Sequence, residues 1–170
     1  MSFQVMALRQ AMYNARARMI DEDNAEARLR GKRSKNKGDQ GEMIARRALI
    51  DMGYLFIRRI ATPWIIRRDR NGKVIGAKAG DKVAGDWRAV HPETGWSVLA
   101  EVKLRDNPTL QYSTLEDHQH RSLAEHSEAG GISLLIWVHD STPYVLPYPI
   151  EGFKPRSSIT IEQAKELNWL

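Results

Sequence analysis

The chain has 170 residues, of which 42% are hydrophobic and 28% are charged, and it contains no cysteine. This length fits one domain with a hydrophobic core and room for one appended element, and it excludes a large multidomain protein. Because the chain has no thiol, disulfides, iron–sulfur clusters and thiolate zinc sites are excluded. Any metal must therefore be held by oxygen or histidine ligands.

The formal net charge of +5 is distributed unevenly. Residues 28–88 carry 17 Lys and Arg against 6 Asp and Glu, whereas the segments on either side are net acidic. A positive field concentrated in about a third of the chain indicates a polyanionic partner, and nucleic acid is the natural candidate. The sequence has neither a signal-peptide pattern at its start nor 18 consecutive apolar residues. The expected location is therefore the cytoplasm, or the host cytoplasm for a phage-encoded protein, with no membrane association.

The first expected element is an N-terminal helix within residues 1–27, because apolar residues recur there at spacings of three and four. Its apolar stripe would pack either on its own domain or on a second subunit. Residues 28–38 are expected to form a basic linker, with six positive charges between Arg28 and Lys37. Such a run is typical of a solvated linker or of an arm that follows phosphates.

Residues 39–170 are expected to form the main domain, beginning with a helix. Asp39-x-x-Glu42 has the spacing of a capping box, and Gly53 is a typical helix stop. Glu42 falls on the flank of the apolar face of this helix. It is either a capping carboxylate that also favours the helix dipole, or a functional one.

A strand over residues 54–60 and a basic ribbon come next. Asn71-Gly72, which separates two basic, apolar runs, is a strong signal for a β-hairpin. Residues 61–84 are therefore predicted to form a basic β-ribbon inserted into the main domain.

A further hairpin brings acidic and basic residues together. Residues 86–91 and 96–103 are predicted to pair around a four-residue turn. In this register Asp86 lies directly across from Glu101, and Lys103 emerges on the same face two residues later. Two carboxylates and one ammonium group would converge there.

This convergence suggests metal-dependent chemistry. Opposed carboxylates destabilise a sheet unless a cation offsets them, and oxygen ligands favour Mg²⁺ or Mn²⁺. A bound metal could activate water for phosphodiester hydrolysis, while Lys103 could position or deprotonate that water or stabilise the transition state. The alternative is an ordinary Asp/Glu/Lys cluster on an exposed sheet face.

The last third of the chain predicts further helices and strands. Ser113-x-x-Glu116 has capping-box spacing for a helix that ends at Gly130, strands are expected over residues 132–139 and 143–148, and Thr160 begins a short terminal helix. This order of elements predicts an α/β fold in which a mixed central β-sheet is flanked by helices.

The roles of a glutamine and of two histidines in the last third of the chain are not settled by the pattern. Gln119 lies on the same stripe as Leu115 and Leu123, so it is either a satisfied core amide or a functional residue. His126, like the later His139, has no evident partner and is expected to be structural or exposed. The sequence has no phosphate-binding or dinucleotide-binding loop, so no nucleotide cofactor is expected.

Four features together resemble the active-site pattern of PD-(D/E)XK nucleases, and in particular RecU-type Holliday junction resolvases, over about residues 38–150. They are the helix start Gly38-x-x-Gly41-Glu42, the Thr62-Pro63 step before the ribbon, Asp86 with Glu101-Val102-Lys103, and Asp117-His-Gln-His120 followed by Gly130-Gly131-Ile132. The resemblance implies a restriction-endonuclease-like fold, a homodimer, dependence on Mg²⁺ (or Mn²⁺), and resolution of four-way DNA junctions by paired symmetric nicks.

The resemblance also implies roles for individual residues. It assigns Asp86, Glu101 and Val102 to the metal site, Lys103 to catalysis, and Glu42 and Gln119 to supporting catalytic roles. In that family the ribbon forms a stalk that enters the junction centre. The DNA-binding residues expected on the arm and ribbon are Arg30, Lys32, Arg33, Lys35, Lys37, Arg67, Arg68, Arg70, Lys73 and Lys78.

Two other functions stay open on the sequence. One is a nuclease of the same superfamily that acts on flaps, nicks or duplex sites. The other is a non-catalytic DNA-binding module that uses the basic arm and ribbon.

Overall fold

The computed structural model of the chain describes residues 29, 31–32, 36–61, 63–80 and 85–170. The chain divides into two units, residues 1–39 and residues 40–170. The expected helix within residues 1–27 lies outside the described residues, as do Arg30, Arg33 and Lys35. No helix in the described part of the chain is long and apolar enough to cross a membrane.

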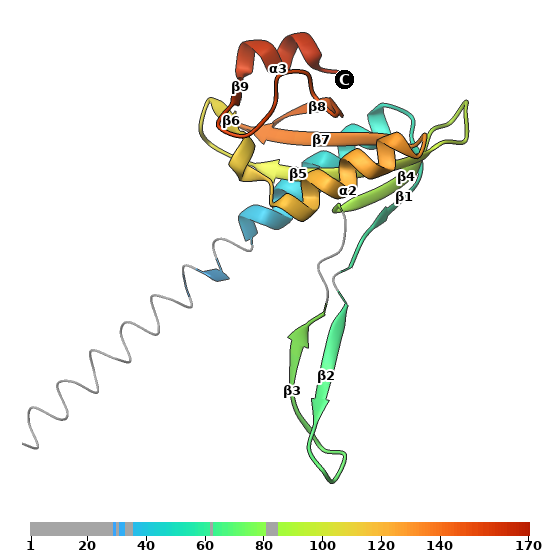
Figure 1. Cartoon of the computed structure of the whole chain (residues 1–170), viewed down its shortest axis with the longest axis vertical. Coiled ribbons are helices and arrows are strands. Elements are labelled where there is room, and N and C mark those ends of the chain that lie inside the picture. The colour runs from blue at the N-terminus through green and yellow to red at the C-terminus, as the bar shows by residue number, and fades with distance from the viewer. Residues whose placement is uncertain (1–28, 30, 33–35, 62, 81–84) are drawn as a thin grey trace, which may run out of the picture. The chain divides into compact units, whose positions relative to one another are not determined.

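A mixed five-stranded sheet organises the second unit, in the order β1-β4-β5-β7-β8. Strands β5 and β7 are parallel, and the other neighbouring pairs are antiparallel (Figure 1). The predicted α/β class, with a mixed central sheet flanked by helices, is confirmed. The strands are β1 (Leu55–Arg59), β4 (Trp87–Val90), β5 (Ser97–Leu104), β7 (Ile132–His139) and β8 (Thr142–Tyr148).

Helices cover both faces of this sheet. The alternate side chains of β5 show which helix packs on which face. Val98 and Ala100 are buried in the same apolar cluster as Leu49, from the helix over residues 36–51. Leu99 points the other way and is buried with Leu123 of α2 (Asp117–Glu128). Because side chains alternate between the faces of a strand, the odd-numbered residues of β5 share the α2 face.

Short elements complete the α2 side of the domain. Strands β6 (Thr109–Gln111) and β9 (Ser158–Thr160) form a small antiparallel sheet, followed respectively by the 3₁₀ helix η1 (Tyr112–Thr114) and by α3 (Ile161–Leu167). The predicted cap of the last helix is confirmed, since the Gln163 N–H donates to the Thr160 hydroxyl at 3.3 Å.

Two predicted helix starts are wrong. The first helix already includes Asn36, so Asp39 lies inside it and does not cap it. In the second case Ser113 belongs to η1, and α2 is capped by Glu116, whose N–H donates to the Gln119 side chain at 2.9 Å. Capping boxes are short local patterns, and the surrounding chain decides which of several candidates is used. The predicted stop at Gly53 is confirmed by its φ of 80°.

The ribbon forms as predicted and is a separate two-stranded sheet of β2 (Trp64–Arg68) and β3 (Val74–Ala79). At its tip, Asp69 Oδ1 accepts hydrogen bonds from two backbone N–H groups at 2.9 Å each. At its base, the Gly80 N–H donates to the Pro63 carbonyl at 2.7 Å. These bonds hold the two strands together at the tip and at the base of the ribbon.

The predicted register of the β4–β5 hairpin is confirmed over four pairs, from Trp87–Ala100 to Val90–Ser97. Asp86 lies just outside this ladder, with its N–H donating to the Ala100 carbonyl at 2.8 Å. The predicted Asp86–Glu101 ladder pair is therefore wrong. The reason is Gly85, whose φ of 70° turns the backbone immediately before the strand.

Replacing Gly85 with Ala should destabilise the domain by about 2–4 kcal/mol, through an unfavourable φ and a steric clash. A Cβ atom at Gly85 would lie 2.7 Å from Leu99 Cδ1 and 3.0 Å from the Ala100 carbonyl oxygen. Gly95→Ala is the matched control, because Gly95 has a φ of 71° with no atom within 4 Å of the added Cβ. Urea unfolding of both variants measures the difference. Equal losses of stability would show that the contact with Leu99 contributes nothing.

Candidate active site

The centre of the site is a buried carboxylate on the α2 face of β5. Glu101 is only 2% exposed. Its Oε1 atom accepts a hydrogen bond from Lys103 Nζ at 2.7 Å. Gln119, on α2, donates a hydrogen bond from Nε2 to the same oxygen. The cluster therefore does not lie on an exposed sheet face, which removes that alternative.

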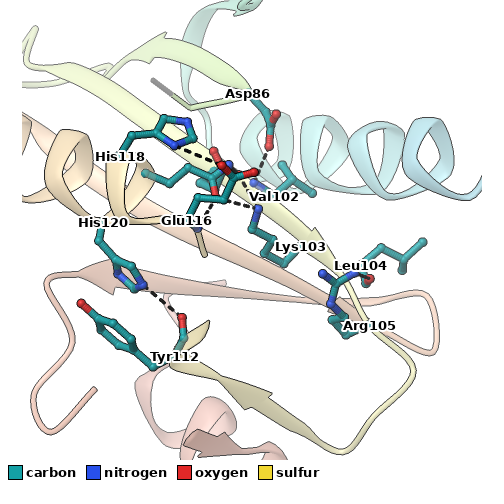
Figure 2. Close-up of polar contacts among 11 residues, drawn as sticks. Asp86, Val102, Lys103, Leu104, Arg105, Tyr112, Glu116, His118 and His120 are labelled. Atoms are coloured by element: carbon teal, nitrogen blue, oxygen red, sulfur yellow. Dashed lines mark hydrogen bonds and ion pairs between the residues drawn. The ribbon is translucent and has the colours of Figure 1, made fainter. Parts of the chain in front are cut away.

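Asp86 joins this cluster from the start of β4. Its Oδ2 atom accepts a hydrogen bond from the Val102 N–H at 2.7 Å (Figure 2). The N–H and C=O groups of a strand residue point to the same side, so the Val102 carbonyl lies on the side of β5 that faces β4. Although the ladder does not pair Asp86 with Glu101, the turn at Gly85 still brings both carboxylates together.

Burial shifts the pKa values of both acids upward. Burial raises the pKa of Glu101 to about 7, and the neighbouring Asp86 carboxylate contributes to this rise, while Lys103 opposes the shift. Burial also raises the pKa of Asp86, against the lowering effects of the Val102 N–H, Lys103 and Arg59. The one positive charge of Lys103 thus does not cancel the rise in pKa that burial causes in the two carboxylates.

Gln119 connects the two charged groups to the start of α2. Its Oε1 atom accepts a hydrogen bond from Lys103 Nζ at 3.0 Å and one from the Glu116 N–H at 2.9 Å. The amide oxygen of Gln119 therefore faces Lys103, and its amide nitrogen faces Glu101. Of the two sequence alternatives for Gln119, a core amide and a site residue, the contacts place it in the polar cluster.

Glu42 is connected to the site through an arginine that the sequence analysis did not select. Arg59 Nη2 donates to Glu42 Oε1 at 2.6 Å, and the positive charge of Arg59 lowers the pKa of Asp86. Arg59 is the last residue of β1, next to Ile60, whose N–H donates to the Asp86 carbonyl at 2.8 Å. Only this pairing of β1 with β4 brings it near Asp86, and no local motif indicates it.

Two histidines of α2 have structural partners. His120 is buried, and its Nδ1 atom is bonded to the Tyr148 hydroxyl at 2.7 Å. Its Nε2 atom is bonded to the Tyr112 carbonyl at 3.0 Å (Figure 2). His126 bonds to Ser97 and Ser133 at 2.7 and 3.0 Å, so the expectation that it lacks a partner is wrong. Both anchor α2 to the sheet, and for His126 this fits the predicted structural role.

The predicted DNA-binding residues of the ribbon are all exposed on β2, β3 or the turn between them; they are Arg67, Arg68, Arg70, Lys73 and Lys78. Lys32 and Lys37 are exposed in helical segments before the sheet domain. The ribbon also exposes apolar side chains, which the sequence analysis did not anticipate. They are Ile65, Ile66, Val74 and Ile75, each 48–59% exposed.

The oxygen atoms that could hold a metal here come from two carboxylates and one main-chain carbonyl. Across the described residues, no group of three or more His, Cys, Asp and Glu side chains is placed to hold a metal ion. Within the same residues, Asp86 Oδ1 and Glu101 Oε2 carry no hydrogen bond. These two oxygens and the Val102 carbonyl are hard ligands of the kind that Mg²⁺ and Mn²⁺ prefer.

The sheet order and the Asp86–Glu101–Lys103 cluster define an α/β protein whose mixed five-stranded sheet carries a partly buried group of two carboxylates and one ammonium. No protein-family model matches the chain, and no curated protein matches its sequence. Among solved structures, the chain is similar to Hjc, a Holliday junction resolvase from the archaeal hyperthermophile Archaeoglobus fulgidus. The two share 16% sequence identity with a TM-score of 0.49, over 74% of this chain and 93% of Hjc.

Proposed function

We propose that this protein is a metal-dependent, structure-selective DNA endonuclease that resolves four-way junctions by paired symmetric nicks. The observation that carries the proposal is the cluster that Asp86, Lys103 and Gln119 form around the buried Glu101, between the sheet and α2. Desolvating two carboxylates and ordering an ammonium group costs folding free energy, so stability alone does not explain the cluster. Such clusters concentrate at catalytic sites. The basic ribbon in the same domain supplies the contacts that a DNA substrate requires.

Asp86, Glu101 and the Val102 carbonyl would hold Mg²⁺ or Mn²⁺. Each offers oxygen ligands, and burial raises the pKa of both acids despite the opposing charge of Lys103. The metal would lower the pKa of a bound water and neutralise charge on the phosphoryl oxygens.

Lys103 would act directly on the phosphate or on the attacking water. Contacts to Glu101 and Gln119 at 2.7 and 3.0 Å hold its Nζ atom in place, and its side chain is only 14% exposed. An ammonium group ordered in this way can donate to a non-bridging oxygen as negative charge develops there. Gln119 would position Lys103 and Glu101, whereas Arg59 and Glu42 would set the charge around Asp86.

The symmetric reaction requires two copies of this site. Paired nicks in two strands need two sets of catalytic groups, and the described part of one chain carries one such set. We therefore propose a homodimer acting on a four-way junction. The exposed cations of the ribbon would follow phosphates, and its exposed isoleucines would face unpaired or unstacked bases.

The decisive experiment is incubation with synthetic four-way junctions, labelled on each strand in turn, with and without Mg²⁺. We expect nicks at symmetric positions in two opposed strands, only when the metal is present. Equal cleavage of flaps, nicked duplexes or linear duplexes would favour a less selective nuclease. Junction binding without cleavage of any substrate in Mg²⁺ or Mn²⁺ would contradict the enzyme and leave a DNA-binding module.

A further inference from the structure

A groove lies beside the proposed active site, on the same face of the sheet. Its volume is about 440 Å³, and its lining includes Phe56, Arg88, Ser97, Leu99 and His126. Leu99 faces α2. Ser97, Leu99, Glu101 and Lys103 are odd-numbered residues of β5, so they follow one another along this face. From Glu101 to Ser97 the strand rises about 13 Å.

Two arginines lie side by side on neighbouring strands, and one of them, Arg88, lines the groove. Arg58 of β1 and Arg88 of β4 are cross-strand partners, and Arg88 in turn pairs with Leu99, so both arginines share the α2 face. Both are exposed, and neither forms an ion pair with any residue in the described part of the chain. Like charges directly opposed on a sheet are unfavourable. An anion bound between them would relieve this repulsion.

An aromatic ring stands at the same groove. Phe56 is 75% exposed, and its φ of 50° is unusual for a bulky residue. It lies at the irregularity of β1 between Leu55 and Arg58. The surrounding strand pairing thus maintains an uncommon backbone conformation that presents the ring to solvent, a combination frequent at ligand-binding positions.

The opposite wall of the groove is held by a directional hydrogen-bond chain. The Ser133 hydroxyl donates to the Leu123 carbonyl at 2.6 Å, so it must accept from His126 Nδ1 at 3.0 Å. His126 Nε2 therefore accepts from the Ser97 hydroxyl at 2.7 Å. Ser97 lines the groove, and its hydroxyl oxygen retains acceptor capacity of the kind that suits the amino or imino groups of a base.

From this geometry we propose that the groove binds one unpaired nucleotide of the DNA substrate, with Arg58 and Arg88 on its phosphate and Phe56 stacked on its base. The inference rests on the proposed function and names a second contact for the same strand. An exposed aromatic ring next to cations is the usual recognition device for single-stranded nucleic acid. Such a groove would favour substrates with unpaired nucleotides near the cut over fully paired duplexes.

Binding without divalent metal tests the groove separately from cleavage. Fluorescence anisotropy in EDTA compares a labelled eight-residue oligothymidylate with a blunt duplex. We expect Phe56→Ala to weaken oligothymidylate binding about 5-fold or more and to leave duplex binding unchanged. Phe56→Gly, which tolerates a positive φ, should behave like Phe56→Ala. The double variant Arg58→Ala/Arg88→Ala should weaken oligothymidylate binding about 10-fold and reduce its salt slope by about 0.7, because it removes the contacts to one phosphate.

Matched controls come from other surfaces of the domain. Arg47→Ala removes an exposed arginine from the first helix, and Trp169→Ala removes an exposed aromatic ring near the C-terminus; both should bind like wild type. Wild-type binding of oligothymidylate by both Phe56 variants would overturn the proposal, as would equal losses in the controls. If wild type cuts no DNA in Mg²⁺ while the groove variants lose binding, the proposed nuclease activity is wrong and the proposed nucleotide-binding site is supported.

Discussion

Replacing Lys103 with Met should lower the rate of junction cleavage about 10²- to 10⁴-fold, while junction binding stays within about twofold of wild type. Met retains most of the aliphatic stem but cannot donate a hydrogen bond or carry charge. The variant removes the only ammonium group that contacts Glu101 and Gln119 among the described residues. Binding should persist because the ribbon cations are unchanged. Single-turnover cleavage and anisotropy on the same junction measure the two quantities.

Two further variants define what Lys103 contributes. Lys154→Met removes an exposed lysine from a turn far along the chain from the cluster and should cleave like wild type. Lys103→Arg should restore little activity, because the planar guanidinium does not match the single-point contacts at 2.7 and 3.0 Å. Wild-type cleavage by Lys103→Met would contradict the proposed active site.

Replacing Glu101 with Gln should stabilise the metal-free protein at pH 8 by up to about 3 kcal/mol, and should change its stability little at pH 4.5. In the folded protein the pKa of Glu101 is about 7, against an ordinary value of 4.5. Between these values the folded state holds a proton that the unfolded state releases. The stabilisation is complete below pH 4.5 and is lost as the pH rises through 7. A glutamine side chain cannot ionise, so the variant avoids this loss.

Urea unfolding in EDTA at several pH values between 4.5 and 8.5 measures this effect. The pKa of Asp86 is also raised by burial, so the variant should keep a weaker decline with rising pH. Glu93→Gln, in the exposed hairpin turn, is the control and should follow wild type. A parallel decline for wild type and Glu101→Gln would show that Glu101 is not the titrating group.

Manganese extends the same measurement to the proposed metal site. A ligand that binds only the folded protein raises its free energy of unfolding. Mn²⁺ at pH 8 should therefore stabilise wild type and Glu93→Gln but not Glu101→Gln. Stabilisation of all three proteins to the same extent would place the metal elsewhere.

Local patterns in the sequence predicted most of the strands and the pairing register of the β4–β5 hairpin. The apolar runs over β7 and β8 and the Asn-Gly signal of the ribbon are short-range features, and the structure contains those elements where they were expected. The four-residue turn of the β4–β5 hairpin set its pairing by chain geometry alone. That register placed Glu101 and Lys103 on one face before any tertiary contact was considered.

The sequence by itself thus determined the α/β class, the ribbon, and the placement of Glu101 and Lys103 along one strand, because each depends on residues close in the chain. Tertiary structure decided the burial of Glu101, the approach of Gln119 from α2, and the position of Arg59 near Asp86. It also replaced the expected Asp86–Glu101 ladder pair with a contact to the Val102 N–H. These features depend on how separate helices and strands pack, and burial together with charge partners across that packing controls both protonation and orientation.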